Sequence, residues 1–86
     1  MQIVIKLLEA NYLGDYRIEL SFSDGSRGVL DVRDYCAARH GPLLDPLRSE
    51  DYVRRLIIDA GALGWPNGLE LSPDRLYELC RQGVVA

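Results

Sequence analysis

Polar and apolar residues alternate almost without interruption from Asp15 to Ser23. One face of this segment carries Tyr16, Ile18, Leu20 and Phe22, and the other carries Asp15, Arg17, Glu19 and Ser21. A period of two over this length predicts a half-buried strand in an antiparallel sheet. The segment from Arg27 to Val32 predicts a second strand, and Asp24 and Gly25 form the turn between the two.

The turn chemistry decides which residues of these strands face each other. Asp24-Gly25 suits either a two-residue loop or a type I turn that ends in a left-handed glycine bulge. The two-residue loop would place Ile18 opposite Asp31, which puts a carboxylate on the apolar face. The bulged loop places Ile18 opposite Leu30 and Arg17 opposite Asp31. We therefore predict the bulged register.

The N-terminal segment predicts a first strand from Met1 to Leu8, with a turn over 11–14 that completes a three-strand meander. Both faces of this strand are apolar, at Ile3, Val4 and Ile5. A water-facing strand does not need apolar residues on both faces, so these three residues are the candidate interface with another chain. The alternative is that a closing helix, Pro73 to Arg81, covers the second face within the monomer.

Short helices are predicted in the middle of the chain. One runs from Arg33 to Arg39 and is stopped by Gly41 and Pro42. The segment from Leu43 to Leu47 is expected to be irregular and buried. Ser49 is expected to cap a second helix, which runs to about Arg55.

The C-terminal part predicts a second hairpin. A short strand over 56–58 turns at Ala60-Gly61 into a strand that ends at Trp65. Trp65-Pro66-Asn67-Gly68 suits a type I turn, with proline second, asparagine third and a left-handed glycine fourth. This turn would set Trp65 opposite Leu69 and Leu63 opposite Leu71.

A closing helix follows. Ser72 is its predicted N-cap and Pro73 its first residue, and its inward stripe consists of Leu76, Leu79 and Cys80. We assign structural tasks to Asp24, Gly25, Trp65, Pro66, Asn67, Gly68, Ser72, Pro73 and Tyr77. The whole pattern predicts one α+β domain over 1–86, in which a three-strand antiparallel meander plus a second hairpin is packed by two or three short helices.

Composition narrows the classes of function. The 86 residues are 48% hydrophobic and 27% charged, which is typical of a single small globular domain. The net charge is −3, with ten basic against thirteen acidic residues, and this disfavours direct binding of nucleic acid. Lys6 and Glu9 interrupt the apolar N-terminal run, so it is neither a signal peptide nor a membrane span. Two isolated cysteines then indicate free thiols in a cytoplasmic protein.

Candidate catalytic and metal-binding residues are few. A helix would bring Cys36 and His40 onto one face, but the sequence offers no third group to orient the imidazole and no oxyanion pocket. One histidine and two isolated cysteines cannot supply the about four nitrogen and sulfur ligands of a zinc site. The segment 25–28 lacks the lysine and the following helix of a phosphate loop. We therefore expect no enzyme, no cofactor and no metal.

Two further constellations have simpler structural explanations. The pairs Glu50 with Asp51 and Asp59 with Glu70 could do acid–base work only in a cleft that shifts their pKa values, for which so short a chain has little room. Glu50 and Asp51 are equally well explained by their favourable position in the first turn of a helix. Asp59 and Glu70 are equally well explained as solvent-exposed residues near strand ends. Base stacking on the aromatic residues would need a basic groove, so Tyr16, Phe22 and Trp65 are expected in the core.

Three segments carry a family resemblance: "YRIELSFSDGSRGVLDV", "PLRSEDYVRRLIID" and "GWPNGLELSPDRLYEL". From Tyr16 to Glu78 the chain resembles the bacterial domain-of-unknown-function family 2442. The resemblance implies an α+β fold. Members of the family occur as stand-alone chains or fused ahead of a helix-turn-helix domain. Their genes often neighbour a gene of another small uncharacterised family, and the two have been proposed to form a toxin–antitoxin pair. It implies no catalytic residue. The chain shows neither a DNA-reading helix nor a long disordered tail, which argues against a regulatory role.

These observations favour a protein-interaction module, an antitoxin-like partner of a small neighbouring protein. The expected partner is another small protein or a second copy of the chain, with no direct nucleic acid and no membrane. The alternatives are a regulatory or oligomerisation domain that works with a separate helix-turn-helix protein, and a small enzyme.

Overall fold

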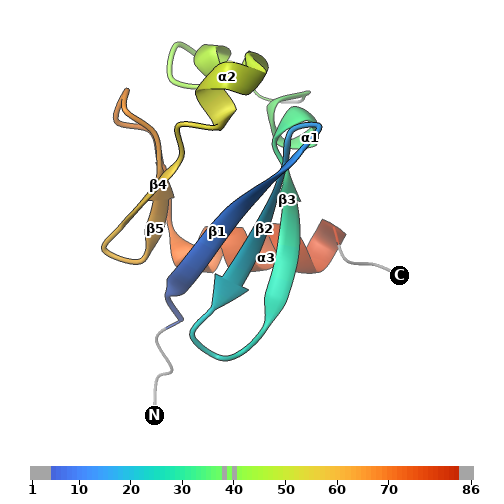
Figure 1. Cartoon of the computed structure of the whole chain (residues 1–86), viewed down its shortest axis with the longest axis vertical. Helices are drawn as coiled ribbons and strands as arrows, with labels where there is room; N and C mark the ends of the chain where they lie inside the picture. The colour runs from blue at the N-terminus through green and yellow to red at the C-terminus, as the bar shows by residue number, and fades with distance from the viewer. Residues whose placement is uncertain (1–4, 38, 40, 84–86) are drawn as a thin grey trace.

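The computed structural model describes residues 5–37, 39 and 41–83, which form two small antiparallel sheets and three short α-helices (Figure 1). The elements are β1 (Leu7–Gly14), β2 (Arg17–Phe22), β3 (Arg27–Asp31), α1 (Val32–Ala37), a 3-10 helix (Asp45–Arg48), α2 (Glu50–Val53), β4 (Ile57–Asp59), β5 (Ala62–Gly64), β6 (Glu70–Leu71) and α3 (Pro73–Gly83). The strand orders are β1-β2-β3 and β4-β5-β6. The predicted α+β class and the meander are confirmed, and the second hairpin is part of a three-stranded sheet.

The predicted register of the β2–β3 hairpin is confirmed. Ile18 lies opposite Leu30 and Arg17 lies opposite Asp31. The Phe22 N–H donates to the Ser26 carbonyl at 2.9 Å, and Gly25 has a φ of 88°, as the bulged turn requires.

The strand predicted over Met1 to Leu8 is confirmed only at Leu7 and Leu8, and the turn predicted over 11–14 is wrong. Residues 1–4 of the predicted strand lie outside the part of the chain that the structure describes. β1 begins at Leu7 and continues to Gly14, through the segment predicted to turn. The chain reverses instead at Asp15 and Tyr16, whose φ values of 53° and 64° are both left-handed. Glu50, far along the chain, stabilises this turn through Tyr12: its carboxylate accepts a hydrogen bond from the Tyr12 hydroxyl at 2.6 Å, and the oxygen of that hydroxyl accepts one from the Tyr16 N–H at 3.0 Å. A contact of this kind cannot be read from local turn propensity.

The middle of the chain differs from prediction in three details. α1 begins one residue earlier than expected and ends at Ala37. Leu47 is buried as expected, but Leu43 is 47% exposed. α2 ends at Val53, and the Ser49 side chain makes no capping hydrogen bond, contrary to prediction. Ser49 also ends the preceding 3-10 helix.

The Trp-Pro-Asn-Gly turn connects β5 to β6 as predicted. The Trp65 N–H donates to the Leu69 carbonyl at 3.0 Å, Gly68 has a φ of 93°, and Leu63 lies opposite Leu71. At the start of α3, the Ser72 hydroxyl accepts a hydrogen bond from the Arg75 N–H at 3.2 Å, which is the expected N-cap.

One hydrophobic core joins both sheets to the helices. Its most deeply buried side chains include Ile18, Leu20, Leu47, Val53, Leu63 and Leu76. Figure 1 shows α3 crossing behind the first sheet, with its C-terminal end extending past β3. Leu76 and Cys80 face inward from α3 as predicted, whereas Leu79 is only half-buried. Among the described helices, none has the length and apolar character needed to span a bilayer.

Candidate functional site

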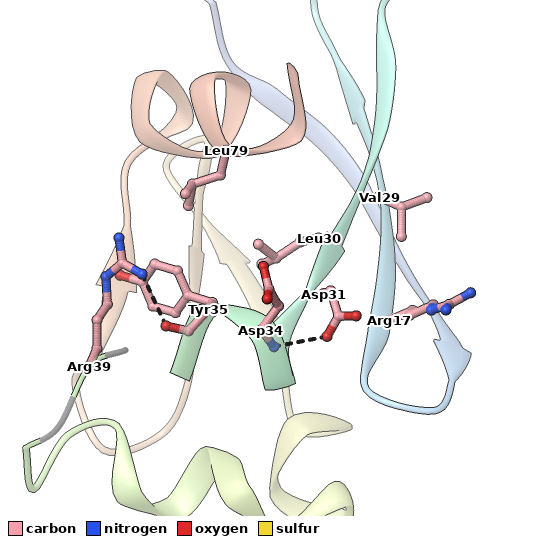
Figure 2. A pocket seen from close by; sticks show the side chains of 8 residues that line it. All are labelled: Arg17, Val29, Leu30, Asp31, Asp34, Tyr35, Arg39 and Leu79. Atoms are coloured by element: carbon pink, nitrogen blue, oxygen red, sulfur yellow. Dashed lines mark hydrogen bonds between the residues drawn. The ribbon is translucent and has the colours of Figure 1, made fainter. Parts of the chain in front are cut away.

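A groove of about 530 Å³ lies beside β3, where the edge of the first sheet meets α1 and α3 (Figure 2). Its apolar lining consists of Val29, Leu30, Tyr35 and Leu79, and its charged lining consists of Arg17, Asp31, Asp34 and Arg39. Leu79 reaches into the groove from α3, which is why this residue of the helix stripe remains half-buried. The groove therefore combines an apolar floor with charges of both signs.

The junction between β3 and α1 fixes one side of the groove. Asp31 ends the strand, and its Oδ1 accepts a hydrogen bond from the Asp34 N–H at 3.0 Å. This bond satisfies one of the free N–H groups at the start of α1, so the strand passes into the helix without a loop. On the far side, the Arg39 guanidinium lies 4.2 Å from the centre of the Tyr35 ring and donates to the Tyr35 carbonyl at 3.0 Å.

The groove charges have no ionic partners among the residues that the structure describes. The ion pairs found there are Arg33–Asp15, Arg48–Asp45 and Arg54–Glu50, all of them outside the groove. A smaller depression of about 160 Å³, lined by Arg39, Leu79, Arg75 and Glu78, shares Arg39 and Leu79 with the groove. The rim of the groove thus offers guanidinium and carboxylate groups that a bound segment could reach.

The backbone of β3 is unpaired along the groove. Phe22 with Ser26 and Tyr16 with Val32 are hydrogen-bonded at the two ends of the β2–β3 ladder. Because such pairs alternate along an antiparallel ladder, the N–H and C=O groups of residues 27, 29 and 31 point away from β2. No described strand pairs with that side of β3. The N–H groups of residues 27, 29 and 31 and the C=O groups of residues 27 and 29 can bind another extended segment, whereas the Asp31 carbonyl accepts the first hydrogen bond of α1.

The other three sheet edges in the described part of the chain are less suited to strand addition. β1 is interrupted by register shifts that leave Leu8 and Leu13 as extra residues, and bulges of this kind discourage edge pairing. Its Leu7 N–H already donates to the Gly61 carbonyl at 3.0 Å. β4 has three residues and β6 has two. β3, with five residues in unbroken register, is the longest regular free edge.

The interface predicted at the N-terminus is not placed in full by the structure. Ile3 and Val4 lie outside the described residues. Ile5 is half-buried and packs against the core, and it precedes β1 rather than belonging to it. The groove residues were not singled out from the sequence. The available signal was the symmetric placement of Arg27 and Asp31 around Val29, which becomes meaningful only once β3 is known to be an edge.

The Trp-Pro-Asn-Gly run lies away from this groove. It contacts α2 and the segment before the 3-10 helix. The Trp65 Nε1–H donates to the Val53 carbonyl at 3.2 Å. The Asn67 side chain donates to the Leu43 carbonyl at 3.0 Å, and the Asn67 N–H donates to the Tyr52 hydroxyl at 2.9 Å. Pro66 is exposed. These contacts hold the turn in place.

Tyr77 links α3 to the β2–β3 turn. Its hydroxyl donates to Asp24 Oδ2 at 3.0 Å, and its ring meets the Phe22 ring edge-to-face at 5.2 Å between centres. Asp24 also accepts from the Ser26 hydroxyl at 2.6 Å and from the Ser26 N–H at 2.9 Å. The hydrogen bonds from Ser26 hold the pKa of the Asp24 carboxyl below its ordinary value.

The candidate catalytic groups are dispersed. Cys36 and Cys80 are buried free thiols, and burial raises the pKa of both, that of Cys80 to about 11. His40 lies outside the described residues. Asp59 and Glu70 lie on the two outer strands of the second sheet, with β5 between them. Among the described residues, no group of three histidine, cysteine or carboxylate side chains could hold a metal ion.

Comparison with known proteins gives one match. A family model described as "Protein of unknown function (DUF2442)" matches residues 7–82. Neither the comparison with curated proteins nor that with solved structures found a match. The matched span runs from the start of β1 to the last turn of α3, so it includes β3 and the whole groove.

Proposed function

The chain belongs to the family described as Protein of unknown function (DUF2442), and we propose that it is a protein-interaction module that adds a strand of another polypeptide to the free edge of β3. The regular, unpaired edge beside a groove carries this proposal. In strand addition, main-chain hydrogen bonds supply affinity, and pockets for alternate side chains supply specificity.

The groove supplies the second requirement of this binding mode. The main chain of a strand paired with β3 would bond to residues 27, 29 and 31, and every second side chain would point toward the α3 side of the sheet. On that side Leu30, Tyr35 and Leu79 offer an apolar surface. Arg39 and Asp34 flank this surface and can select the charges of the neighbouring side chains. An extended segment with alternating apolar and charged residues fits these features.

The identity of the polypeptide separates two forms of the proposal. An antitoxin-like chain would bind a small protein encoded beside it. A regulatory or oligomerisation domain would instead be found with a helix-turn-helix protein. Mass spectrometry of the complex purified from the native host distinguishes the two.

The test compares one substitution at the β3 edge with a matched one at the β4 edge. Val29→Pro removes an outward N–H without breaking a bond inside the hairpin. Ile58→Pro is the control, because Asp59 and Ala62 flank a two-residue turn and the Ile58 N–H therefore also points outward. The two side chains are similarly exposed, at 37% and 40%.

We expect Val29→Pro to weaken the native complex by roughly tenfold or more and Ile58→Pro to leave it unchanged. Hydrogen exchange gives an independent measurement: the amides of residues 27, 29 and 31 should exchange more slowly in the complex. A complex that survives Val29→Pro with these amides still exchanging freely would contradict strand addition at β3.

A further inference from the structure

The outward-facing residues of β3 are arranged symmetrically around Val29. Arg27 and Asp31 lie two residues before and after it, and all three side chains lie on the face of the sheet opposite α3. Val29 is 37% exposed, and Arg27 is exposed. A strand with a basic residue at one end, an apolar centre and an acidic residue at the other end is complementary to itself when it is reversed.

We propose that the polypeptide bound at β3 is a second copy of this chain, paired antiparallel to β3 about a two-fold axis through Val29. This inference rests on the proposed function and names its partner. The pairing would join two three-stranded sheets into one sheet of six strands. Closed two-fold assemblies of this kind use the same surface on both copies.

The backbone geometry agrees with this register. When Val29 faces Val29 of the second copy as a hydrogen-bonded pair, Arg27 and Asp31 also face each other as hydrogen-bonded pairs. The pairing then uses the N–H and C=O groups of residues 27 and 29 and the N–H of Asp31, all of which point away from β2. No backbone bond inside either hairpin has to break.

The side chains select the same register. Arg27 of each copy lies opposite Asp31 of the other, so the pairing forms two cross-strand ion pairs around a Val29–Val29 contact. A register centred on Gly28 would set Arg27 against Val29, and one centred on Leu30 would set Asp31 against Val29. Charged residues on an edge strand normally discourage pairing, and here they favour the complementary register over these two alternatives.

The position of α3 is consistent with the same assembly. Both copies of the helix would lie on one face of the joined sheet, because the two-fold axis is perpendicular to that sheet. The C-terminal end of α3 extends past β3, toward the position of the second copy (Figure 1). The groove beside β3, with its half-buried Leu79, would then face the second copy instead of solvent.

The test is the mass of the assembly in solution, measured by sedimentation equilibrium over a range of micromolar concentrations. We expect the wild-type chain to reach twice the mass of one chain. Arg27→Asp places like charges opposite each other twice and should give a monomer, as should Asp31→Arg. An equal mixture of the R27D and D31R variants should recover the doubled mass, because each copy then complements the other.

Arg55→Asp is the matched control, since it makes the same charge change at an exposed arginine away from β3 and should remain a dimer. Asp31 also caps α1, so circular dichroism must show that D31R is folded. If D31R does not fold, the comparison of R27D with R55D decides the question, together with Val29→Lys, which should also dissociate the dimer.

Three results would overturn self-pairing: a wild-type monomer at every concentration, a dimer that R27D leaves intact, or a mixture of folded R27D and D31R that stays monomeric. If the wild-type chain is a monomer and Val29→Pro abolishes binding of a different protein, only this inference is wrong and the proposed function still holds. If the wild-type chain is a monomer and the Val29→Pro variant binds the native partner as tightly as wild type does, both this inference and the proposed function are wrong.

Discussion

Trp65 connects three parts of the fold through one side chain. Its ring is 2% exposed, its indole N–H donates to the carbonyl that ends α2, and its backbone closes the turn between β5 and β6. A buried ring of this size contributes a large apolar contact area, and its buried N–H has a hydrogen-bond acceptor in the Val53 carbonyl. The residue therefore determines how the second sheet packs against α2.

We predict that Trp65→Ala lowers the free energy of unfolding by about 3–5 kcal/mol, because it leaves a cavity and removes the hydrogen bond from the indole N–H to Val53. Such a loss is a large share of the total stability of a domain of this size, which is on the order of 5–10 kcal/mol. Urea denaturation measures the change. Leu8→Ala, at a residue that is 59% exposed, is the control and should have little effect. A Trp65→Ala protein as stable as wild type would show that the ring is not part of the core.

At the scale of elements, α3 and β3 lie in close contact. A Cβ placed on Gly28 would overlap the Cβ of Cys80 and lie 3.0 Å from its Sγ. Glycine at this position therefore allows the helix to approach the strand, as at other sites of close backbone approach. The same contact positions Leu79 at the groove and leaves the outer side of β3 uncovered.

We predict that Gly28→Ala destabilises the protein by about 1–3 kcal/mol, because the helix and the strand must move apart to admit the methyl group. Gly64→Ala is the matched control on β5, where the added Cβ meets the flexible Glu70 side chain at 3.3 Å. Thermal unfolding of both variants measures the difference. Equal melting temperatures for the two would contradict a tight α3–β3 contact.

At the scale of the whole molecule, Glu50 connects the turn of the first sheet to α2. Its carboxylate accepts the Tyr12 hydroxyl, 38 residues away in the sequence, and the Arg54 guanidinium lies 3.8 Å from it. The hydrogen bond from Tyr12, with the nearby Arg54 charge, holds the pKa of Glu50 below its ordinary value of 4.5. Because the unfolded chain then binds this proton more readily than the folded one, ionised Glu50 stabilises the fold.

We predict that Glu50→Gln lowers the free energy of unfolding at neutral pH and makes it less dependent on pH in the acid range. The contribution of Glu50 is fully present above its unfolded-state pKa and disappears as the pH falls through the lowered folded-state pKa. The curves for wild type and variant should therefore converge at low pH. Asp24, whose pKa is also lowered, leaves some acid dependence in the variant.

Urea denaturation at a series of pH values from 7 downward tests this prediction. Glu70→Gln, at an exposed position on β6, is the control. Parallel curves for wild type and Glu50→Gln at all pH values would show that folding does not lower the pKa of Glu50.

The sequence by itself determined the elements whose signals are local. Alternation over β2 and the Asp24-Gly25 turn specified that Ile18 faces Leu30, because both signals act within one hairpin. The Trp-Pro-Asn-Gly turn and the Ser72 cap were equally local, and the structure shows both. Short-range rules of backbone geometry are sufficient in these places.

Only the tertiary structure decided the extent of β1 and the position of the groove. Non-glycine residues take up the left-handed turn at Asp15 and Tyr16 where Glu50 and Tyr12 supply hydrogen bonds from other elements. The free edge of β3 likewise depends on where α3, α1 and the second sheet come to lie. Which edge of a sheet remains uncovered is set by long-range packing, and no local pattern of side chains contains that information.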